Sequence, residues 1–211
     1  MKIGIIGTGK MGTGLAKYWA KGGHELMFSF SHDEAKLRAT AASIGVGTRV
    51  GSPAEAAEFG DVVLLATPYS ASAQALREAG PLRGKVLFSC VNALKPDLSG
   101  MAVGTTTSGA EELSKLVPEA RFVEALPPFA EILHTRFAAN ERAAGTTFYC
   151  GNDPDAKSTV AELLREIGVD PIDAGPLTNA RFLEPAMMLL IQLAYPLGMG
   201  PIGLKLILAE E

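Results

Sequence analysis

Residues 3–12 spell Ile-Gly-Ile-Ile-Gly-Thr-Gly-Lys-Met-Gly, and this stretch decides the fold. The apolar residues up to Ile6 predict a buried strand, and glycines at 7, 9 and 12 then lead into a helix. Gly7 permits a sharp turn, Gly9 lets a pyrophosphate approach the backbone, and Gly12 lets the helix pack closely on the strand. A helix N-terminus also offers free N–H groups and a positive dipole end to phosphates. The stretch therefore predicts a dinucleotide site formed by Gly7, Thr8, Gly9, Lys10, Met11 and Gly12.

A Gly-Lys pair also occurs in the P-loops that bind nucleoside triphosphates. Such a loop has Ser or Thr directly after the Lys, because that hydroxyl is a ligand of Mg²⁺. Met11 stands at this place, so we exclude a nucleoside triphosphatase.

Strands and helices alternate along most of the chain. This alternation predicts an α/β fold of the Rossmann type, with a doubly wound and mainly parallel sheet. The strands are expected at 3–6, 25–30, 48–50, 61–66, 85–91, 121–126, 147–150 and 171–173, and the helices between them at 10–21, 33–43, 53–59, 72–79, 108–116 and 155–167.

The pattern changes after Gly175-Pro176 to a long helix rich in Leu and Met. We expect this helix at residues 179–195, with Thr178 as its N-cap, and a last short helix at 202–208. The chain is thus expected to divide into a nucleotide-binding domain at 1–174 and a small C-terminal helical domain at 175–211.

The composition is that of a globular chain with a large core, since 47% of its residues are hydrophobic and 20% are charged. A net charge of −4 does not favour nucleic acid as a partner. The most apolar stretch, residues 186–208, is interrupted by Gln192, Pro196 and several glycines, so we expect protein contacts there and no membrane span. Cys90 and Cys150 form no CxxC pair, which predicts no metal site and two reduced thiols in a cytoplasmic protein.

The end of the second strand distinguishes NAD from NADP. An NAD site typically has Asp or Glu there to accept from the ribose 2′-hydroxyl. This strand ends Ser31-His32, and Asp33 is expected to be the N-cap of the next helix. Without a carboxylate, a 2′-phosphate is accommodated by Ser31 and His32, with help from Lys36 or Arg38. NADP is therefore favoured over NAD, although a histidine in a loop can also have no role.

Ligands of open α/β sheets bind at the carboxyl ends of the strands. Thr67, Pro68, Asn92 and Ala93 follow the fourth and fifth strands and are predicted to line the cofactor. Ordinary turn chemistry is the alternative explanation for these residues. Flat apolar surface for a substrate ring is predicted from Tyr69 and Phe129.

No residue has the type and place of a catalytic proton carrier. Oxidation of an alcohol needs such a group, and the chain has no Lys between Lys157 and Lys205. Hydride transfer between two redox rings needs mainly that the rings are stacked. Ring-to-ring transfer is therefore favoured over an imine or hydroxyacid dehydrogenase, and the catalytic residues stay unassigned. The remaining candidates, in unclear places, are His134, Glu131, Glu124 and Arg181.

Residues 173–181 spell Asp-Ala-Gly-Pro-Leu-Thr-Asn-Ala-Arg, and a Leu-rich helix and Gly198-Met199-Gly200 follow. This part resembles the C-terminal part of the NADPH-dependent oxidoreductases that reduce the 5-deazaflavin coenzyme F420. The resemblance implies a homodimer, NADP over Gly7 to Gly12 with its 2′-phosphate near Ser31-His32, and a deazaflavin stacked on the nicotinamide near Met199.

The chain differs from that family at two places. The family carries basic residues where this chain has Ser31 and His32, and its His-Thr-Ile-Pro segment near the nicotinamide is replaced by residues 127–130, Pro-Pro-Phe-Ala. The cofactor domain is also similar to the cytosolic part of membrane ferric reductases, so the acceptor is a deazaflavin, a flavin or another small oxidant. The alternative function is a nucleotide-binding redox sensor or partner module without turnover.

Overall fold

The computed structural model describes residues 1–31, 33–45 and 47–209. Its centre is an eight-stranded sheet in the order β3-β2-β1-β4-β5-β6-β7-β8. Every neighbouring pair is parallel except β6 and β7, which are antiparallel. The predicted Rossmann-type, mainly parallel sheet is therefore confirmed. The strands are β1 (Lys2–Ile6), β2 (Glu25–Ser29), β3 (Arg49–Val50), β4 (Val62–Leu65), β5 (Val86–Ser89), β6 (Arg121–Ala125), β7 (Thr146–Gly151) and β8 (Asp170–Asp173).

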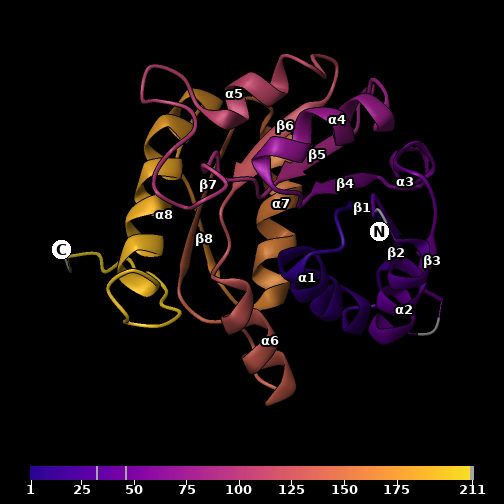
Figure 1. Cartoon of the computed structure of the whole chain (residues 1–211), viewed down its shortest axis with the longest axis horizontal. Coiled ribbons are helices and arrows are strands. Elements are labelled where there is room, and N and C mark those ends of the chain that lie inside the picture. The colour runs from indigo at the N-terminus through magenta and orange to yellow at the C-terminus, as the bar shows by residue number, and fades with distance from the viewer. Residues whose placement is uncertain (32, 46, 210–211) are drawn as a thin grey trace.

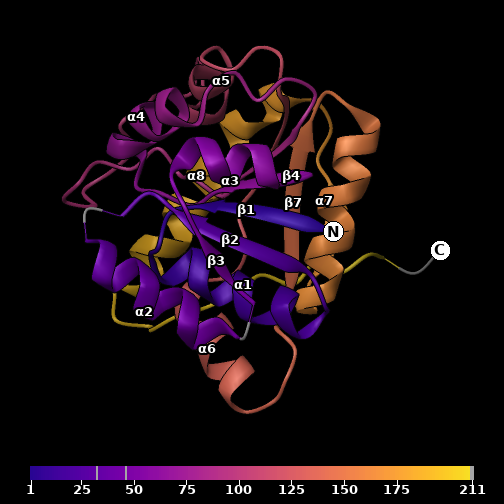
Figure 2. The ribbon, with the colours of Figure 1, turned by 90° about the vertical axis from the view of Figure 1, so that its right-hand side faces the viewer.

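Helices cover both faces of the sheet, which is why β4 and β5 are buried along their whole length. In Figure 2, α3 and α4 lie on one side of β1 and β2, and α1 and α2 lie on the other. Trp19 of α1 is fully buried against Phe88 of β5, with ring centroids 6.1 Å apart. The helices are α1 (Lys10–Lys21), α2 (Glu34–Ile44), α3 (Pro53–Phe59), α4 (Tyr69–Ala79), α5 (Gly109–Ser114), α6 (Ala130–Ala138), α7 (Pro154–Ile167), the 3₁₀ helix η1 (Leu177–Asn179) and α8 (Ala180–Ala194).

The strand order reverses between β1 and β4. From β1 the chain adds β2 and β3 on one side, and it then returns to place β4 on the other side of β1. The carboxyl ends of β1 and β4 therefore adjoin at the point where open α/β sheets bind their ligands. This reversal places the glycine turn after β1 beside the Thr67-Pro68 turn after β4.

The local structure differs from the sequence prediction at three places. Residues 130–138 form α6, which the sequence did not predict, and Thr178 lies inside η1 instead of capping the long helix. The expected helix at 202–208 is absent, because the Leu204 carbonyl accepts from Thr146 N of β7 at 2.7 Å. A helix would need that carbonyl for the amide four residues later. Leu206 N also donates to Thr146 Oγ1 at 3.0 Å, so the segment lies extended beside the start of β7.

The last described residues run past α8 and project away from the body of the molecule (Figure 1). Among the helices of the described residues, none is both long and apolar enough to cross a membrane.

Candidate cofactor and acceptor site

The glycine turn has the geometry that its sequence predicts. Gly7 has a φ of 122°, and a Cβ there would lie 2.4 Å from the Ala66 carbonyl oxygen at the end of β4. A Cβ at Gly12 would lie 2.6 Å from the Gly7 carbonyl oxygen. A Cβ at Gly9, by contrast, would have no heavy atom of the described chain within 4 Å. Gly7 and Gly12 are thus required by packing, whereas Gly9 faces open space where a ligand can approach the backbone.

The N-terminus of α1 is open to an anion. Gly9 is its N-cap and makes no side-chain capping bond, and the first turn carries no acidic residue. The orphan N–H groups and the helix dipole are therefore left for a ligand such as a pyrophosphate. The side chain of Lys10 is 76% exposed beside this turn. The side chain of Met11, by contrast, is partly buried and packs against the core.

The end of β2 borders a cavity of about 190 Å³. Ser31 lines it, and the Ser31 hydroxyl accepts from Asp33 N at 3.2 Å and donates to Asp33 O at 2.9 Å. Asp33 caps α2 as predicted, because its Oδ1 accepts from Lys36 N at 3.0 Å. His32 lies outside the described residues. The described residues that line the cavity include no Lys or Arg; they are Phe30, Ser31, Leu37, Gly51, Ser52, Pro53, Gln74 and Glu78.

The turns after β4 and β5 bring three predicted residues together. α4 begins at Tyr69, earlier than expected, and Thr67 Oγ1 lies 2.8 Å from Ser72 Oγ in its first turn. A Cβ on Gly109 of α5 would lie 2.7 Å from Ala93 Cβ and 3.1 Å from Tyr69 Cε2. Ala93 is fully buried, so neither its main chain nor its side chain is exposed in this structure. The lack of a side chain at Gly109 allows α5 to lie directly over Tyr69 and Ala93.

The predicted acceptor residues divide into two groups. Tyr69 lies beside α5, whereas Phe129 packs edge-on against Tyr195, with ring centroids 5.6 Å apart. Phe129 is buried and lines an apolar cavity of about 230 Å³ together with Met187 of α8 and Leu204. Met199 is 63% exposed in the turn after α8. The C-terminal segment, residues 195–209, therefore lies against the loop after β6 through Phe129.

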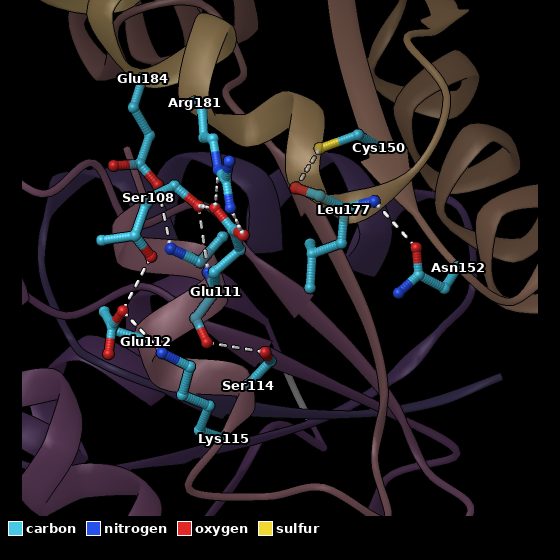
Figure 3. Close-up of polar contacts among 12 residues, drawn as sticks. Ser108, Glu111, Glu112, Ser114, Lys115, Cys150, Asn152, Leu177, Arg181 and Glu184 are labelled. Carbon is cyan, nitrogen blue, oxygen red and sulfur yellow. Dashed lines mark hydrogen bonds and ion pairs between the residues drawn. The ribbon is translucent and has the colours of Figure 1, made fainter. Parts of the chain in front are cut away.

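Two acidic residues that were not predicted as site residues hold α8 to α5, near the carboxyl ends of the strands. Glu184 is 1% exposed, and its carboxylate accepts from the amides of Gly109 and Ala110 at 3.0 and 2.9 Å. Glu111 accepts two bonds from the Arg181 guanidinium, at 2.8 and 2.7 Å. Figure 3 shows both acidic side chains at the junction of α5 and α8. Their only sequence signal is an acid within the apolar run of α8 and a Ser-x-x-Glu pattern at Ser108.

Asn92 connects this junction to the end of β5. Its Nδ2 donates to the main-chain oxygen of Glu184 at 3.2 Å, and its buried Oδ1 has no hydrogen-bond partner among the described residues. A buried amide oxygen without a donor is unusual. Asn92 thus positions α8 with one end of its amide and leaves the other end free for a ligand donor.

Glu124 lies in the middle of β6 and is fully buried. Its neighbours across the sheet are Ser89 and Cys150, and neither carboxylate oxygen has a hydrogen-bond partner within the described chain. Burial raises the pKa of Glu124 well above its usual value, and the nearby Glu184 carboxylate raises it further. Burial also raises the pKa of the Cys150 thiol to about 12. Both shifts favour the uncharged forms of these two side chains.

His134 has the structural place that its apolar neighbours suggested. Its Nε2 lies 2.9 Å from the Lys10 carbonyl oxygen, and its Nδ1 lies 3.3 Å from Lys17 Nζ. The ring therefore fixes α6 against the first turns of α1. Both cysteines are free thiols.

The comparisons with known proteins agree with this geometry. Residues 2–93 match the family model described as "NADP oxidoreductase coenzyme F420-dependent". The chain is 30% identical to the F420-dependent NADP reductase of Methanocaldococcus jannaschii over 92% of both chains. It is also 28% identical to the metalloreductase STEAP3 of Rattus norvegicus, over 87% of this chain but only 36% of that protein.

A solved structure from Arthrobacter sp. FB24, described as a proposed F420-dependent NADP reductase, matches with a TM-score of 0.84. The two chains are 28% identical, and the match covers 98% of this chain and 99% of the other. The likeness thus spans the C-terminal part as well as the nucleotide-binding part. From the 30% identity over almost the full length, together with the glycine turn at the point where the sheet reverses, it follows that this chain belongs to the family of F420-dependent NADP reductases.

Proposed function

We propose that this protein transfers a hydride between NADP(H) and the 5-deazaflavin coenzyme F420. The observation that carries the proposal is the match over 92% of both chains to a protein named F420-dependent NADP reductase. When NADPH is the donor, the hydride leaves the nicotinamide, the deazaflavin accepts it together with a proton from the solvent, and NADP⁺ is released. The protein's part is to hold two rings in contact and to exclude water, which needs no dedicated acid or base.

The proposed cofactor site uses the sequence-predicted residues in distinct ways. The pyrophosphate would bind the main chain from Gly7 to Gly12, including Thr8, Lys10 and Met11, at the open N-terminus of α1. The adenosine end would enter the cavity beside Ser31, and its 2′-phosphate would accept from that hydroxyl in place of the Asp33 main-chain oxygen. Thr67, Pro68, Asn92 and Ala93 would line the nicotinamide end, where the unpartnered Oδ1 of Asn92 can accept from a carboxamide.

We also propose that Tyr69, Phe129 and Met199 contribute to the acceptor site. Tyr69 lies at the carboxyl end of β4, and Phe129 lies at the carboxyl end of β6. The rings and the exposed Met199 side chain offer flat or adaptable apolar surface to a tricyclic ring. Because Phe129 packs on Tyr195, the acceptor would contact Phe129 by an edge unless Tyr195 moves.

The experiment is an anaerobic assay that follows the absorbance of NADPH with and without oxidised coenzyme F420. We expect NADPH oxidation only when the deazaflavin is present, and slower oxidation with NADH. The Gly9→Val variant is the matched control, because it should fold and yet be inactive. If NADPH bound tightly and neither the deazaflavin nor any flavin in a panel were reduced, the sensor function would replace the reductase.

A homodimer is proposed from the exposed apolar side chains of α8 and the C-terminal segment. Phe182 is 72% exposed and Leu189 is 60% exposed, although Leu190 and Ile191 on the same helix are buried within the chain. Ile207 and Leu208 are exposed as well. Apolar side chains gathered on one surface favour contact with a second copy. Sedimentation equilibrium should give twice the chain mass, and Leu189→Glu should lower it to the chain mass.

The remaining proposals concern domains and location. A division into residues 1–174 and 175–211 is supported by the end of the last strand at Asp173. A cytoplasmic location is supported by the two free thiols.

A further inference from the structure

Glu131 connects two parts of the proposed site that are far apart in the sequence. It lies in the first turn of α6, directly after the loop that leaves β6. One carboxylate oxygen lies 3.3 Å from Lys10 Nζ, at the glycine turn. The other accepts from the Tyr195 hydroxyl at 3.3 Å, at the end of α8. A single carboxylate thus bridges the phosphate-binding turn and the C-terminal segment.

The position of this carboxylate is fixed from both sides. His134, one turn later on α6, holds the helix to the Lys10 carbonyl oxygen at 2.9 Å. The Phe129 ring, two residues before Glu131, packs edge-on against Tyr195. Burial acts to raise the pKa of Glu131, but hydrogen bonds from its own main chain, Lys10 and Tyr195 lower the pKa overall. The side chain is therefore a held anion beside the Lys10 ammonium.

A pyrophosphate at the N-terminus of α1 would lie beside the same ammonium. Lys10 is the first residue of α1, and α1 has no acidic residue in its own first turn. Glu131 therefore supplies from another element the negative charge that α1 itself lacks. An anion that pairs with Lys10 in the free protein repels a phosphate and competes with it for the Lys10 ammonium.

We propose that Glu131 is a positioning residue that competes with the cofactor's pyrophosphate for Lys10 and so sets the affinity for NADP(H). When the pyrophosphate takes Lys10, Tyr195 keeps the carboxylate in place at the end of α8. The inference rests on the proposed function, because it requires NADP(H) at the glycine turn.

A double-mutant cycle tests the proposal by binding alone. The dissociation constant of NADP⁺ is measured by calorimetry for the wild type, Glu131→Gln, Lys10→Met and the double variant. Glu131→Gln should tighten binding about twofold to fivefold, the range expected for one exposed ion pair. In the Lys10→Met background the same change should have a much smaller effect, because the contested ammonium is gone. High salt should reduce the difference between the wild type and Glu131→Gln.

The matched control is Glu119→Gln, which changes the net charge equally. Glu119 pairs with Arg83 at 2.9 Å in the loop before β6, at the opposite edge of the sheet from the glycine turn. Glu119→Gln should leave the affinity for NADP⁺ unchanged. An equal effect of Glu131→Gln in both Lys10 backgrounds, or weaker binding, would overturn the inference and leave the proposed function standing. No binding of NADP⁺ to the wild type would overturn the proposed function, and the inference with it.

Discussion

Replacement of Glu124 by Gln should change how the stability of the protein depends on pH. The two side chains have nearly the same shape, so the apolar packing around β6 is kept. The wild-type carboxyl is fully buried, has no hydrogen-bond partner among the described residues, and faces a second buried carboxylate, that of Glu184. An isolated buried carboxylate is very costly, so burial and the nearby Glu184 carboxylate favour the protonated form of Glu124 in the folded state.

The sign of the pH effect follows from the raised pKa of Glu124. In the unfolded chain a glutamate loses its proton near its usual pKa of about 4.3. Between that pH and the higher pKa of the folded state, the folded protein binds one proton more than the unfolded chain. The free energy of unfolding therefore falls as the pH rises, by about 1.4 kcal/mol for each pH unit. Glu124→Gln cannot titrate and should lose this slope.

Urea denaturation measures this pH dependence of the free energy of unfolding, at pH values from 5 to 8 in steps of about one unit. The stability of Glu124→Gln relative to the wild type should rise by about 1.4 kcal/mol per unit, and it should level off where the folded Glu124 titrates. Glu119→Gln, at an exposed ion pair, serves as the control and should stay parallel to the wild type. Parallel curves for Glu124→Gln and the wild type would refute the reasoning, because they would mean that the folded protein already holds Glu124 ionised.

Three further predictions concern the glycine turn and the end of β2. Gly9→Val should leave the thermal midpoint unchanged, because its Cβ meets open space, but calorimetry should find no NADPH binding. Gly7→Ala should lower the free energy of unfolding by about 2 kcal/mol or more, measured in urea, because of the positive φ and the overlap with the Ala66 carbonyl. Replacement of both Ser31 and His32 by Ala should weaken NADPH much more than NADH, and equal losses would place the 2′-phosphate elsewhere.

The sequence predicts the sheet and the glycine turn because their signals are local. The apolar run of β4 and the Gly-x-Gly pattern each lie within a few neighbouring residues. Asp33 was predicted as a cap for the same reason, since it binds a backbone amide three residues away. α6 was not predicted because Phe129, at its N-cap, makes no side-chain capping bond and follows two prolines. The expected helix at 202–208 failed because of a long-range contact, the bond from Thr146.

The contacts of the candidate site that sequence reasoning missed join residues far apart along the chain. Glu184 binds Gly109 N, 75 positions away, and Glu131 binds Lys10 Nζ, 121 positions away. No spacing pattern indicates such pairs, because they form only when α8 and α6 pack against the sheet. Glu124 did carry a local signal, an acid in an apolar strand, but its burial without a partner is visible only in three dimensions.

These distant contacts bear on how a protein without an evident acid or base can promote hydride transfer. Two rings react when they are held at close distance, so the barrier depends on the placement of the elements that bear them. α8 is fixed to the end of β5 by the half-buried Asn92 and to α5 by the buried Glu184 carboxylate. At its other end, α8 is tied to the glycine turn by the more exposed bridge through Glu131. In the proposed site, the buried contacts would supply a rigid wall for a stacked ring, and the exposed bridge would be the part that a charged cofactor opens. One end of α8 can therefore stay fixed through Asn92 and Glu184 while the ion pair near its other end, between Lys10 and Glu131, changes partner.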